Sequence, residues 1–370
     1  MAAYLLKRFA LIIPTLFGIM LINFVIIQFA PGGPVEQVMA QLSGTAAGAT
    51  STVGGGGTDG FSAQQGGLDQ SAGDTSAKYR GSQGLDPEFI AELEQQFGFD
   101  KPAHERFWLM IKNYLTFNFG NSYFQDRPVL DLIADKLPVS MTLGLSMLLI
   151  TYLISIPLGI RKAVADGNKF DVWTSGALVV GYALPGFMVG VFLLVVFAGG
   201  SFYQIFPVGK FSSDGAENLG WFAYILDVAW HLTLPLIAMI LGSFTTLTFL
   251  TKNSFIDEIR KQYVLTARAK GLTENGVLYG HIFRNAMLII IASFPGLFIS
   301  VLFGANLIIE VIFSLDGLGR LGFEAVVERD YPVVFGTLYF FGLVGLLIGI
   351  LSDLMYVWVD PRIDFESRET

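Results

Sequence analysis

Residues 266–287 read TARAKGLTENGVLYGHIFRNAM. This stretch contains two arginines, a lysine, a histidine and a central Gly-Leu-Thr, and long apolar runs lie on both sides of it. Because apolar runs of this length can cross a bilayer, the basic segment between them is predicted to be a loop at one membrane face. The internal pattern of this loop therefore decides which kind of membrane protein the chain is.

The residues around this stretch predict a helix, a tight turn and a second helix. Ser254 matches an N-cap, and residues 255–270 have the apolar spacing of a helix. Gly271 follows directly, where a left-handed glycine commonly ends a helix. Thr273 can N-cap a second helix that continues into the next apolar run. We therefore predict a helical hairpin at the membrane surface.

The residues leave two interpretations of this hairpin open. A short surface helix with a mixed apolar and basic face is typical of an element that docks into the groove of a partner protein. The same pattern is typical of an interfacial helix that lies on anionic lipid.

The composition indicates a membrane protein. The chain has 370 residues, of which 53% are hydrophobic and only 15% are charged, less charge than a soluble domain carries. The absence of cysteine excludes disulfides and thiolate metal sites. The first apolar run is longer than that of a signal peptide, so we expect an uncleaved span. Six runs are long enough to span a membrane, at approximately 9–30, 138–160, 172–198, 228–251, 285–309 and 331–352.

The distribution of lysine and arginine predicts the orientation. With a cytoplasmic N-terminus, 13 of the 23 basic residues fall in short cytoplasmic segments, and six of those lie in the 252–284 loop. Both termini are then predicted to be cytoplasmic. The external segment 31–137 contains 13 acidic and 7 basic residues, which is typical of a solvated loop.

The chain is predicted to have three parts. Residues 1–30 form the N-terminus and first span, residues 31–137 an external segment, and residues 138–370 a core with five spans that includes the 252–284 loop. Within the external segment, residues 41–84 contain 12 glycines and no proline, and we interpret them as a flexible insertion. Residues 86–120 are predicted to be helical, with an aromatic-rich amphipathic part suited to the membrane interface or to packing against the spans.

Proline residues interrupt most of the spans. A proline removes a helix hydrogen bond and kinks the helix, and the freed carbonyl groups need partners from protein or water. The kinks are consistent with a bundle around a path, or with prolines that merely fit the helices together. The prolines inside the first five runs are Pro14, Pro157, Pro185, Pro235 and Pro295.

Several motifs resemble the permeases of ABC importers, in the dipeptide/oligopeptide/nickel group. Tyr263-Val264, residues 266–272, His281 and residues 284–286 resemble the coupling loop of that family. The resemblance covers nearly all of the chain except the 41–84 insertion, and residues 31–34 (PGGP) resemble the first permease of the Yej type. Leu265, Arg284 and Asp316 depart from the common pattern. Further matching segments are residues 97–102, 137–140, 310–313, 317–319, 329–332, 352–356 and 360–363.

The resemblance implies an all-α, type I importer permease with six kinked transmembrane helices and a cytoplasmic coupling hairpin. It implies a non-catalytic subunit of an ATP-driven importer for oligopeptides, including microcin C-like compounds, in the bacterial inner membrane. The implied partners are a second related permease, cytoplasmic ATPase subunits or a fused double ATPase that bind ATP and Mg, and a periplasmic peptide-binding protein. The implied ATPase-coupling residues are Tyr263, Thr266, Ala267, Arg268, Ala269, Lys270, Gly271 and Leu272.

Six spans are too few to enclose a peptide-sized path, so we expect the path to lie between two such bundles. The third to fifth spans are expected to line it, where Pro-Gly pairs loosen the helices and neutral polar groups can bind peptide backbone. The residues expected along this path are Pro185, Gly186, Ser293, Pro295, Gly296, Ser300 and Asn306.

The sequence lacks the motifs of an enzyme. It contains no phosphate-binding G-x-x-x-x-G-K-[ST] and no H-E-x-x-H, and its three histidines lie far apart, so neither ATP hydrolysis nor a metal site is expected in this chain. No nucleophile and base have the spacing of an intramembrane hydrolase. The main alternative is a secondary transporter driven by an ion gradient, but such proteins place carboxylates inside their spans. Here Glu310 and Asp353 lie only at span ends.

Overall fold

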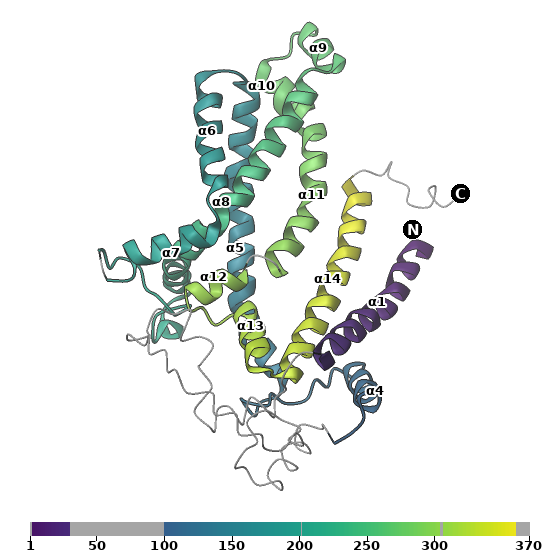
Figure 1. The fold of residues 1–370 in the computed structure, drawn as a ribbon. Helices are drawn as coiled ribbons and strands as arrows, with labels where there is room; N and C mark the ends of the chain where they lie inside the picture. Colours follow the sequence, from purple (N-terminus) through teal and green to yellow (C-terminus); the bar gives the residue numbers. More distant parts are fainter. Residues whose placement is uncertain (1, 30–99, 201, 304–305, 360–370) are drawn as a thin grey trace, which may run out of the picture. The chain divides into compact units, whose positions relative to one another are not determined.

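The computed structural model describes residues 2–29, 100–200, 202–303 and 306–359 (Figure 1). Within these ranges the regular elements are helices, as predicted, apart from one isolated bridge between Asn121 and Pro128. Several predictions lie outside the described residues. These are the 41–84 insertion, the motif at 31–34, the start of the predicted 86–120 helical part and the C-terminal motif at 360–363.

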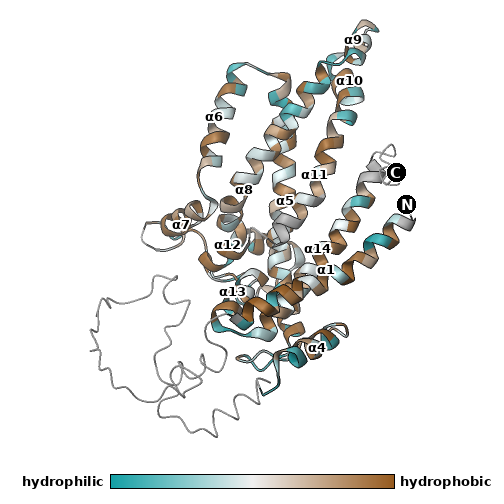
Figure 2. Cartoon of the chain, turned by 45° about the vertical axis from the view of Figure 1, so that its right-hand side comes forward, coloured by the Kyte–Doolittle hydropathy of each residue, from teal (hydrophilic) through white to brown (hydrophobic). Residues whose placement is uncertain are grey.

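Five of the described helices are long and apolar enough to cross a membrane, and a bent pair counts as a sixth. Figure 2 shows hydrophobic residues along most of their length. The first, second, fourth, fifth and sixth spans correspond to α1 (Ala2–Phe29), α5 (Val129–Val164), α8 (Trp221–Ile259), α11 (Phe283–Phe303) and α14 (Tyr331–Val359).

The third predicted span, 172–198, is not one straight helix. It consists of α6 (Lys169–Ala183) and α7 (Gly186–Phe197), which are bent by 89° relative to each other. Leu184 is extended, with ψ of 120°, and Pro185 follows it. A residue before proline is disfavoured in the helical region, which explains why the helix stops there.

The fifth predicted span, 285–309, corresponds to α11 up to Phe303 and to the beginning of α12 from Asn306, and residues 304 and 305 between them lie outside the described residues. The remaining short elements are α4 (Ala103–Tyr114), η1 (Ala216–Asn218), α9 (Gln262–Ala269), α10 (Glu274–Val277), the π-helical η2 (Leu278–Ile282), α12 (Asn306–Ile312) and α13 (Leu318–Glu328).

The described residues pack into two compact units, and the division falls inside α1, α5, α13 and α14. Unit 1 comprises residues 1–12, 136–320 and 343–370, and unit 2 comprises residues 13–135 and 321–342. Unit 1 contains all of α6 to α12 and therefore the predicted hairpin. Unit 2 contains α4.

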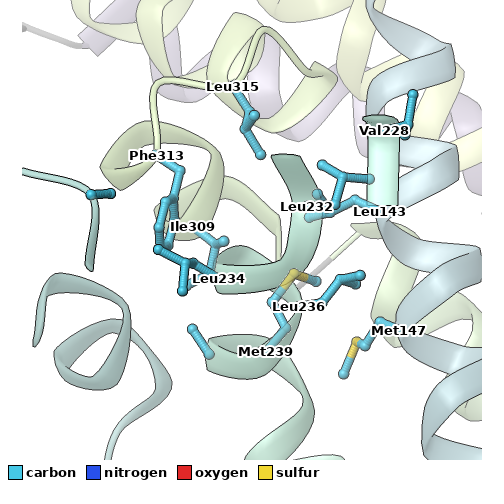
Figure 3. Close-up of a cluster of buried hydrophobic side chains, with 12 residues drawn as sticks. Leu143, Met147, Val228, Leu232, Leu234, Leu236, Met239, Ile309, Phe313 and Leu315 are labelled. Atoms are coloured by element: carbon cyan, nitrogen blue, oxygen red, sulfur yellow. The ribbon is translucent and has the colours of Figure 1, made fainter. Parts of the chain in front are cut away.

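Unit 1 has an apolar core where α5, α8 and α12 meet (Figure 3). Gly159 of α5 lies so close to α8 that a Cβ atom there would be 2.6 Å from Thr251 Cβ and 2.8 Å from the Thr248 carbonyl oxygen. Small residues permit such close contact between membrane helices, so α5 and α8 are tightly joined at this point. The buried side chains of the core are Leu143, Met147, Ala198, Val228, Leu232, Leu234, Leu236, Ala238, Met239, Ile309, Phe313 and Leu315.

Unit 2 is held together by aromatic contacts. The Phe24 ring of α1 lies 5.2 Å from the Phe107 ring of α4 and 6.1 Å from the Phe335 ring of α14, measured between centroids. At the start of α14, Asp330 accepts hydrogen bonds from the Ser122 hydroxyl and, at 3.2 Å, from the Tyr123 backbone N–H. The buried aspartate thus fixes the loop after α4 to the beginning of the last span.

Candidate functional site

The predicted hairpin is present and comprises α9, α10 and η2, residues 262–282. Figure 2 shows hydrophilic and hydrophobic segments mixed in α9 and α10, beyond the ends of α8 and α11. The π-helical η2 connects the hairpin directly to α11. The basic segment therefore caps the fourth and fifth spans.

A glycine-dependent turn ends the first helix of the hairpin. Gly271 has φ of +83°, as predicted. Its N–H donates to the Arg268 carbonyl at 2.9 Å, and the Leu272 N–H donates to the Ala267 carbonyl at 3.4 Å. These two bonds form a Schellman motif, which satisfies carbonyl groups at the helix end. The direction of the chain after α9 is therefore fixed by local hydrogen bonds.

The second helix begins as the sequence indicated. The Thr273 hydroxyl accepts a hydrogen bond from the Gly276 N–H at 3.2 Å, which is an N-cap contact. The Arg268 guanidinium pairs with the Glu274 carboxylate at 2.9 Å across the turn. Both ions are exposed, so this pair contributes little to stability. The turn and its cap, rather than the ion pair, hold the hairpin.

The predicted start of the first helix is wrong. α8 continues through Ile259, and Ser254 is a buried residue within it whose hydroxyl donates to the Ala286 carbonyl at 2.7 Å. The break comes at Lys261, which is extended with ψ of 151°. The N-cap pattern at Ser254 predicted a wrong helix start, because no helix-stop signal lies between the fourth apolar run and Ser254. The fourth span and the first part of the loop are consequently one helix.

The hairpin has a buried face and an exposed face. Val264, Ala267 and Val277 pack into a core with Phe255 and Ala286 of the adjoining helices. Ala267 is only 6% exposed. A partner therefore cannot reach it directly, and Ala267→Glu would bury a carboxylate in the core rather than alter an exposed surface. Among residues 264–272, the exposed ones are Leu265, Thr266, Arg268, Ala269, Lys270, Gly271 and Leu272.

Tyr263 lies at the edge between the two faces. It is half-buried, and its hydroxyl donates to the Glu258 carboxylate at 2.7 Å. Burial raises the pKa of Tyr263, so the hydroxyl stays protonated and continues to donate. Lys261 also pairs with Glu258, and this hydrogen bond raises the pKa of Lys261. Glu258 therefore holds both sides of the break between α8 and α9.

A buried ionic cluster, which the sequence analysis did not predict, lies near the hairpin end of α5, α6 and α8. Lys162 is 0% exposed, and its Nζ atom lies 3.0 Å from the Asp171 carboxylate. Lys252 contacts the same carboxylate at 2.6 Å and Asp166 at 3.0 Å. The remaining Lys162 donors bond Thr174 and Ser175 hydroxyls, both at 2.8 Å. A fully paired cluster of this kind fixes the start of α6 against α5 and α8.

A second buried carboxylate lies near the other end of α5. Glu310 is 0% exposed and accepts hydrogen bonds from the Ser140 hydroxyl at 2.6 Å and the Arg320 N–H at 2.9 Å. Burial raises the pKa of Glu310, against the opposing effect of these donors. A Cβ atom at Gly317 would lie 2.4 Å from the Glu310 carboxyl carbon, and one at Gly319 would lie 2.8 Å from Leu307 Cα. The Gly-Leu-Gly motif is thus explained by close packing around a buried carboxylate at the start of α13.

The predicted pathway residues are spread over several elements. Pro185 and Gly186 lie at the bend of the third span, where a Cβ atom on Gly186 would be 2.8 Å from the Ala238 carbonyl oxygen. Packing against α8 is therefore a sufficient reason for that glycine. In α11, Ser293 donates to the Ile290 carbonyl at 2.8 Å and Gly296 is exposed. Pro295 and Ser300 lie in α11, and Asn306 is the first residue of α12.

An exposed face of α8 was missed by the sequence analysis. Gly242, Thr246 and Asn253 are all exposed and lie at helical spacing on one side of this span. The helical spacing of these residues could have indicated that they share one face of α8. Whether that face is exposed depends on how α8 packs against α5, α7 and α11. Small and neutral polar groups on a membrane helix suit a helix contact or a water-accessible path.

His231 of α8 is bound within its own helix. Its side chain is buried, and its Nδ1 atom lies 2.8 Å from the Asp227 carbonyl oxygen. Within the described residues, no group of three or more potential ligands is placed to hold a metal ion.

Comparison with known proteins gives consistent matches. Residues 155–365 match the family described as binding-protein-dependent transport system inner membrane component. The chain is 61% identical to the peptidoglycan transport system permease protein YejB of Agrobacterium fabrum, and 54% identical to the inner membrane ABC transporter permease protein YejB of Escherichia coli. Both matches cover 100% of each chain. It is 29% identical to the oligopeptide transport system permease protein AppB of Bacillus subtilis, over 99% of this chain and 100% of that one.

The matched region contains the hairpin, the bent third span and the Glu310 motif, so the features described above lie in the part shared with the family. The chain belongs to the binding-protein-dependent transport system inner membrane components, and is an inner-membrane permease of the ABC peptide-importer group that includes the YejB permeases.

Proposed function

We propose that this chain forms half of the membrane path of an ATP-driven oligopeptide importer and couples it to a cytoplasmic ATPase. The observation that carries the proposal is the hairpin, which combines an exposed basic and apolar face with a buried face anchored in the spans. Relatives named for peptidoglycan and oligopeptide transport support a peptide-type substrate. Microcin C-like peptide compounds fall within the same chemical class.

The ATPase would bind the exposed face of the hairpin. Leu265, Lys270 and Leu272 are exposed there and suit a groove with apolar and acidic walls. On the opposite face, Val264 and Val277 are almost completely buried in the core shared with α8 and α11. A push on the hairpin would therefore move these two spans with it, because a packed core does not deform continuously.

The partners follow from the same proposal. ATP and Mg would be bound by the ATPase subunits or by a fused double ATPase, and this chain would bind neither. A periplasmic peptide-binding protein would deliver the substrate, and a second, related permease would form the other half of the path. Both chain termini and the hairpin would lie in the cytoplasm, as the lysine and arginine distribution predicts.

The exposed face of α8 is the part of unit 1 that best suits the path. Gly242, Thr246 and Asn253 present neutral groups, and Gly296 of α11 is exposed as well. Neutral hydrogen-bonding groups allow varied peptides to pass without tight binding. Gly242, Thr246 and Asn253 of α8 extend the set expected from the sequence, which already contains Ser293 and Gly296 of α11.

Uptake into vesicles that contain the whole importer separates the proposal from an ion-gradient transporter. We expect peptide uptake to require ATP on the cytoplasmic side and to continue when proton and sodium gradients are collapsed. Uptake that persists without ATP and stops with the gradient would instead support the secondary transporter.

The hairpin is tested by a charge reversal with a matched control. Lys270→Glu should weaken ATPase co-purification and uptake, because it places an acid on the proposed contact face. Lys210→Glu reverses an exposed lysine that pairs with Asp214 in a loop far from the hairpin in the sequence. This control should bind the ATPase normally. Equal ATPase binding by both variants would contradict the proposed docking face.

A further inference from the structure

Unit 2 contains a cavity that has no part in the hairpin or in the proposed path. Its volume is about 230 Å³, and it lies among the end of α1, α4, the loop after α4 and the start of α14. Apolar and aromatic side chains, among them Phe24, Met110 and Phe335, form most of its wall. An apolar cavity with a few polar groups is the usual form of a site for a small amphiphilic molecule.

The two charged residues that the structure describes along this cavity are both positive. Lys101 and Arg106 line it, whereas none of its described lining residues is acidic. This differs from the external segment 31–137 as a whole, where acidic residues outnumber basic ones by 13 to 7. Burial raises the pKa of Tyr123 to about 12, so that lining hydroxyl carries no negative charge at neutral pH. The cavity is therefore electrostatically suited to an anion.

The two cations differ in how they are held. An Arg106 guanidinium nitrogen donates to the Gln28 side-chain oxygen at 2.8 Å, which positions the arginine at the end of α1. Lys101 forms no hydrogen bond or ion pair with any residue that the structure describes, and its side chain is exposed. Arg106 is thus held in position before a ligand binds, and Lys101 is available to contact the ligand.

An apolar strip of α4 continues from the cavity. Leu109 lines the cavity and is 48% exposed, and the neighbouring Trp108 is 60% exposed. Phe107, on the opposite face of α4, is buried. Tryptophan beside basic residues is typical of a helix at the level of lipid headgroups.

We propose that this cavity binds an anionic glycerophospholipid, with its phosphate near Lys101 and Arg106 and an acyl chain along Leu109 and Met110. The volume favours a lipid, because about 230 Å³ is below the usual range of roughly 300–1,000 Å³ for a site that encloses a whole ligand. A lipid needs to place only part of itself in the cavity and can leave the rest in the bilayer. With the orientation given under the proposed function, on which this point rests, the lipid would belong to the outer leaflet of the inner membrane.

The first test is a lipid titration of the purified, full-length chain, read by native mass spectrometry. Phosphatidylglycerol and phosphatidylcholine with the same acyl chains serve as the probes. We expect phosphatidylglycerol to bind at least fivefold more tightly. Lys101→Gln should weaken phosphatidylglycerol binding about fivefold, because one basic residue near a membrane surface contributes about that factor to the affinity for anionic lipid. The same variant should leave phosphatidylcholine binding unchanged. Lys112→Gln, on the same helix but outside the cavity lining, should leave both affinities unchanged.

The second test addresses the acyl chain. Leu109→Asp should weaken phosphatidylglycerol binding severalfold more than Leu115→Asp, because Leu115 is exposed but does not line the cavity. Competition by inorganic phosphate alone would assign the cations to a free anion and overturn the proposal. Equal binding of both lipids, or equal effects of the Lys101 and Lys112 variants, would overturn it as well. Because the readout is binding, the result does not depend on whether peptide uptake requires ATP.

Discussion

Unit 1 buries one carboxylate near each end of α5, and the two are neutralised in different ways. Asp171 contacts two lysines, Lys162 and Lys252. Glu310 has no lysine or arginine ion pair among the described residues and is held by the Ser140 hydroxyl and a backbone N–H at the start of α13. The stability of a buried ion pair requires both charged partners, because removing one leaves an unpaired charge in the protein interior. A carboxylate held by a helix start depends on space and on the partial positive charge of that helix. The first region should be sensitive to loss of charge and the second to added volume.

The largest effect is expected from removing one cation of the Asp171 cluster. Lys162→Met keeps most of the side-chain volume but removes the charge, and it should lower the free energy of unfolding by about 3–5 kcal/mol. Denaturant unfolding of the full chain in mixed micelles measures this. Lys169→Met, an exposed lysine at the start of α6, is the control and should change stability little. Similar losses in the two variants would show that Lys162 acts only through its contacts with apolar atoms.

A smaller effect is expected from added volume beside Glu310. Gly317→Ala places a Cβ atom within 2.5 Å of the carboxyl group, so it should cost about 1–3 kcal/mol through overpacking. Gly322→Ala is the matched control in the same helix region, because nothing lies within 4 Å of its Cβ position. The control should be neutral or slightly stabilising. An unchanged unfolding free energy in Gly317→Ala would mean that the Glu310 side chain moves aside without cost.

The pH dependence of stability separates the two carboxylates further. Burial raises the pKa of Glu310 above its ordinary value of 4.5, so the folded state binds this proton more tightly than the unfolded state. The contribution of Glu310 to stability is therefore fully present below pH 4.5 and is lost as the pH rises through the raised pKa. Glu310→Gln should remove this dependence because an amide does not titrate, and it should change stability little at low pH, where the protonated carboxyl group also has one donor and one acceptor oxygen. Unfolding of both proteins between pH 4.5 and 8 tests the slope, and identical slopes would exclude Glu310 as its source.

The smallest change in the free energy of unfolding is expected where a substitution affects only the backbone conformation. Gly271→Ala should lower the free energy of unfolding by about 1 kcal/mol, because φ of +83° is unfavourable for a residue with a Cβ atom. Nothing lies within 4 Å of that Cβ position, so no clash adds to the cost. Gly280→Ala, in the same hairpin and also free of close neighbours, is the control. If Gly271→Ala lowered the free energy of unfolding more than Gly317→Ala, the expected order of these two effects would be wrong.

The sequence predicted those features whose signals are local. The spans follow from run length, and the turn at Gly271 follows from a glycine directly after a helical pattern. The bend after Leu184 was signalled by the Pro-Gly pair, although not its angle. The burial of Lys162 and Glu310 could not be predicted, because each lies at the end of an apolar run where a solvated charge is expected. Their partners come from helices distant in sequence, and only the packing of those helices removes the charges from water.

The continuity of α8 has a mechanical consequence. Its 39 residues correspond to a rod of about 58 Å, from Trp221 to the break that leads into the hairpin. A tilt of about one degree at the hairpin end would displace the far end by about 1 Å if the rod stayed rigid. Pro235 is the position where such a lever can bend, and the close contact at Gly159 makes α5 follow the part between Pro235 and the hairpin. If the hairpin tilts as proposed, the part of α8 between the hairpin and Pro235 would move together with α5.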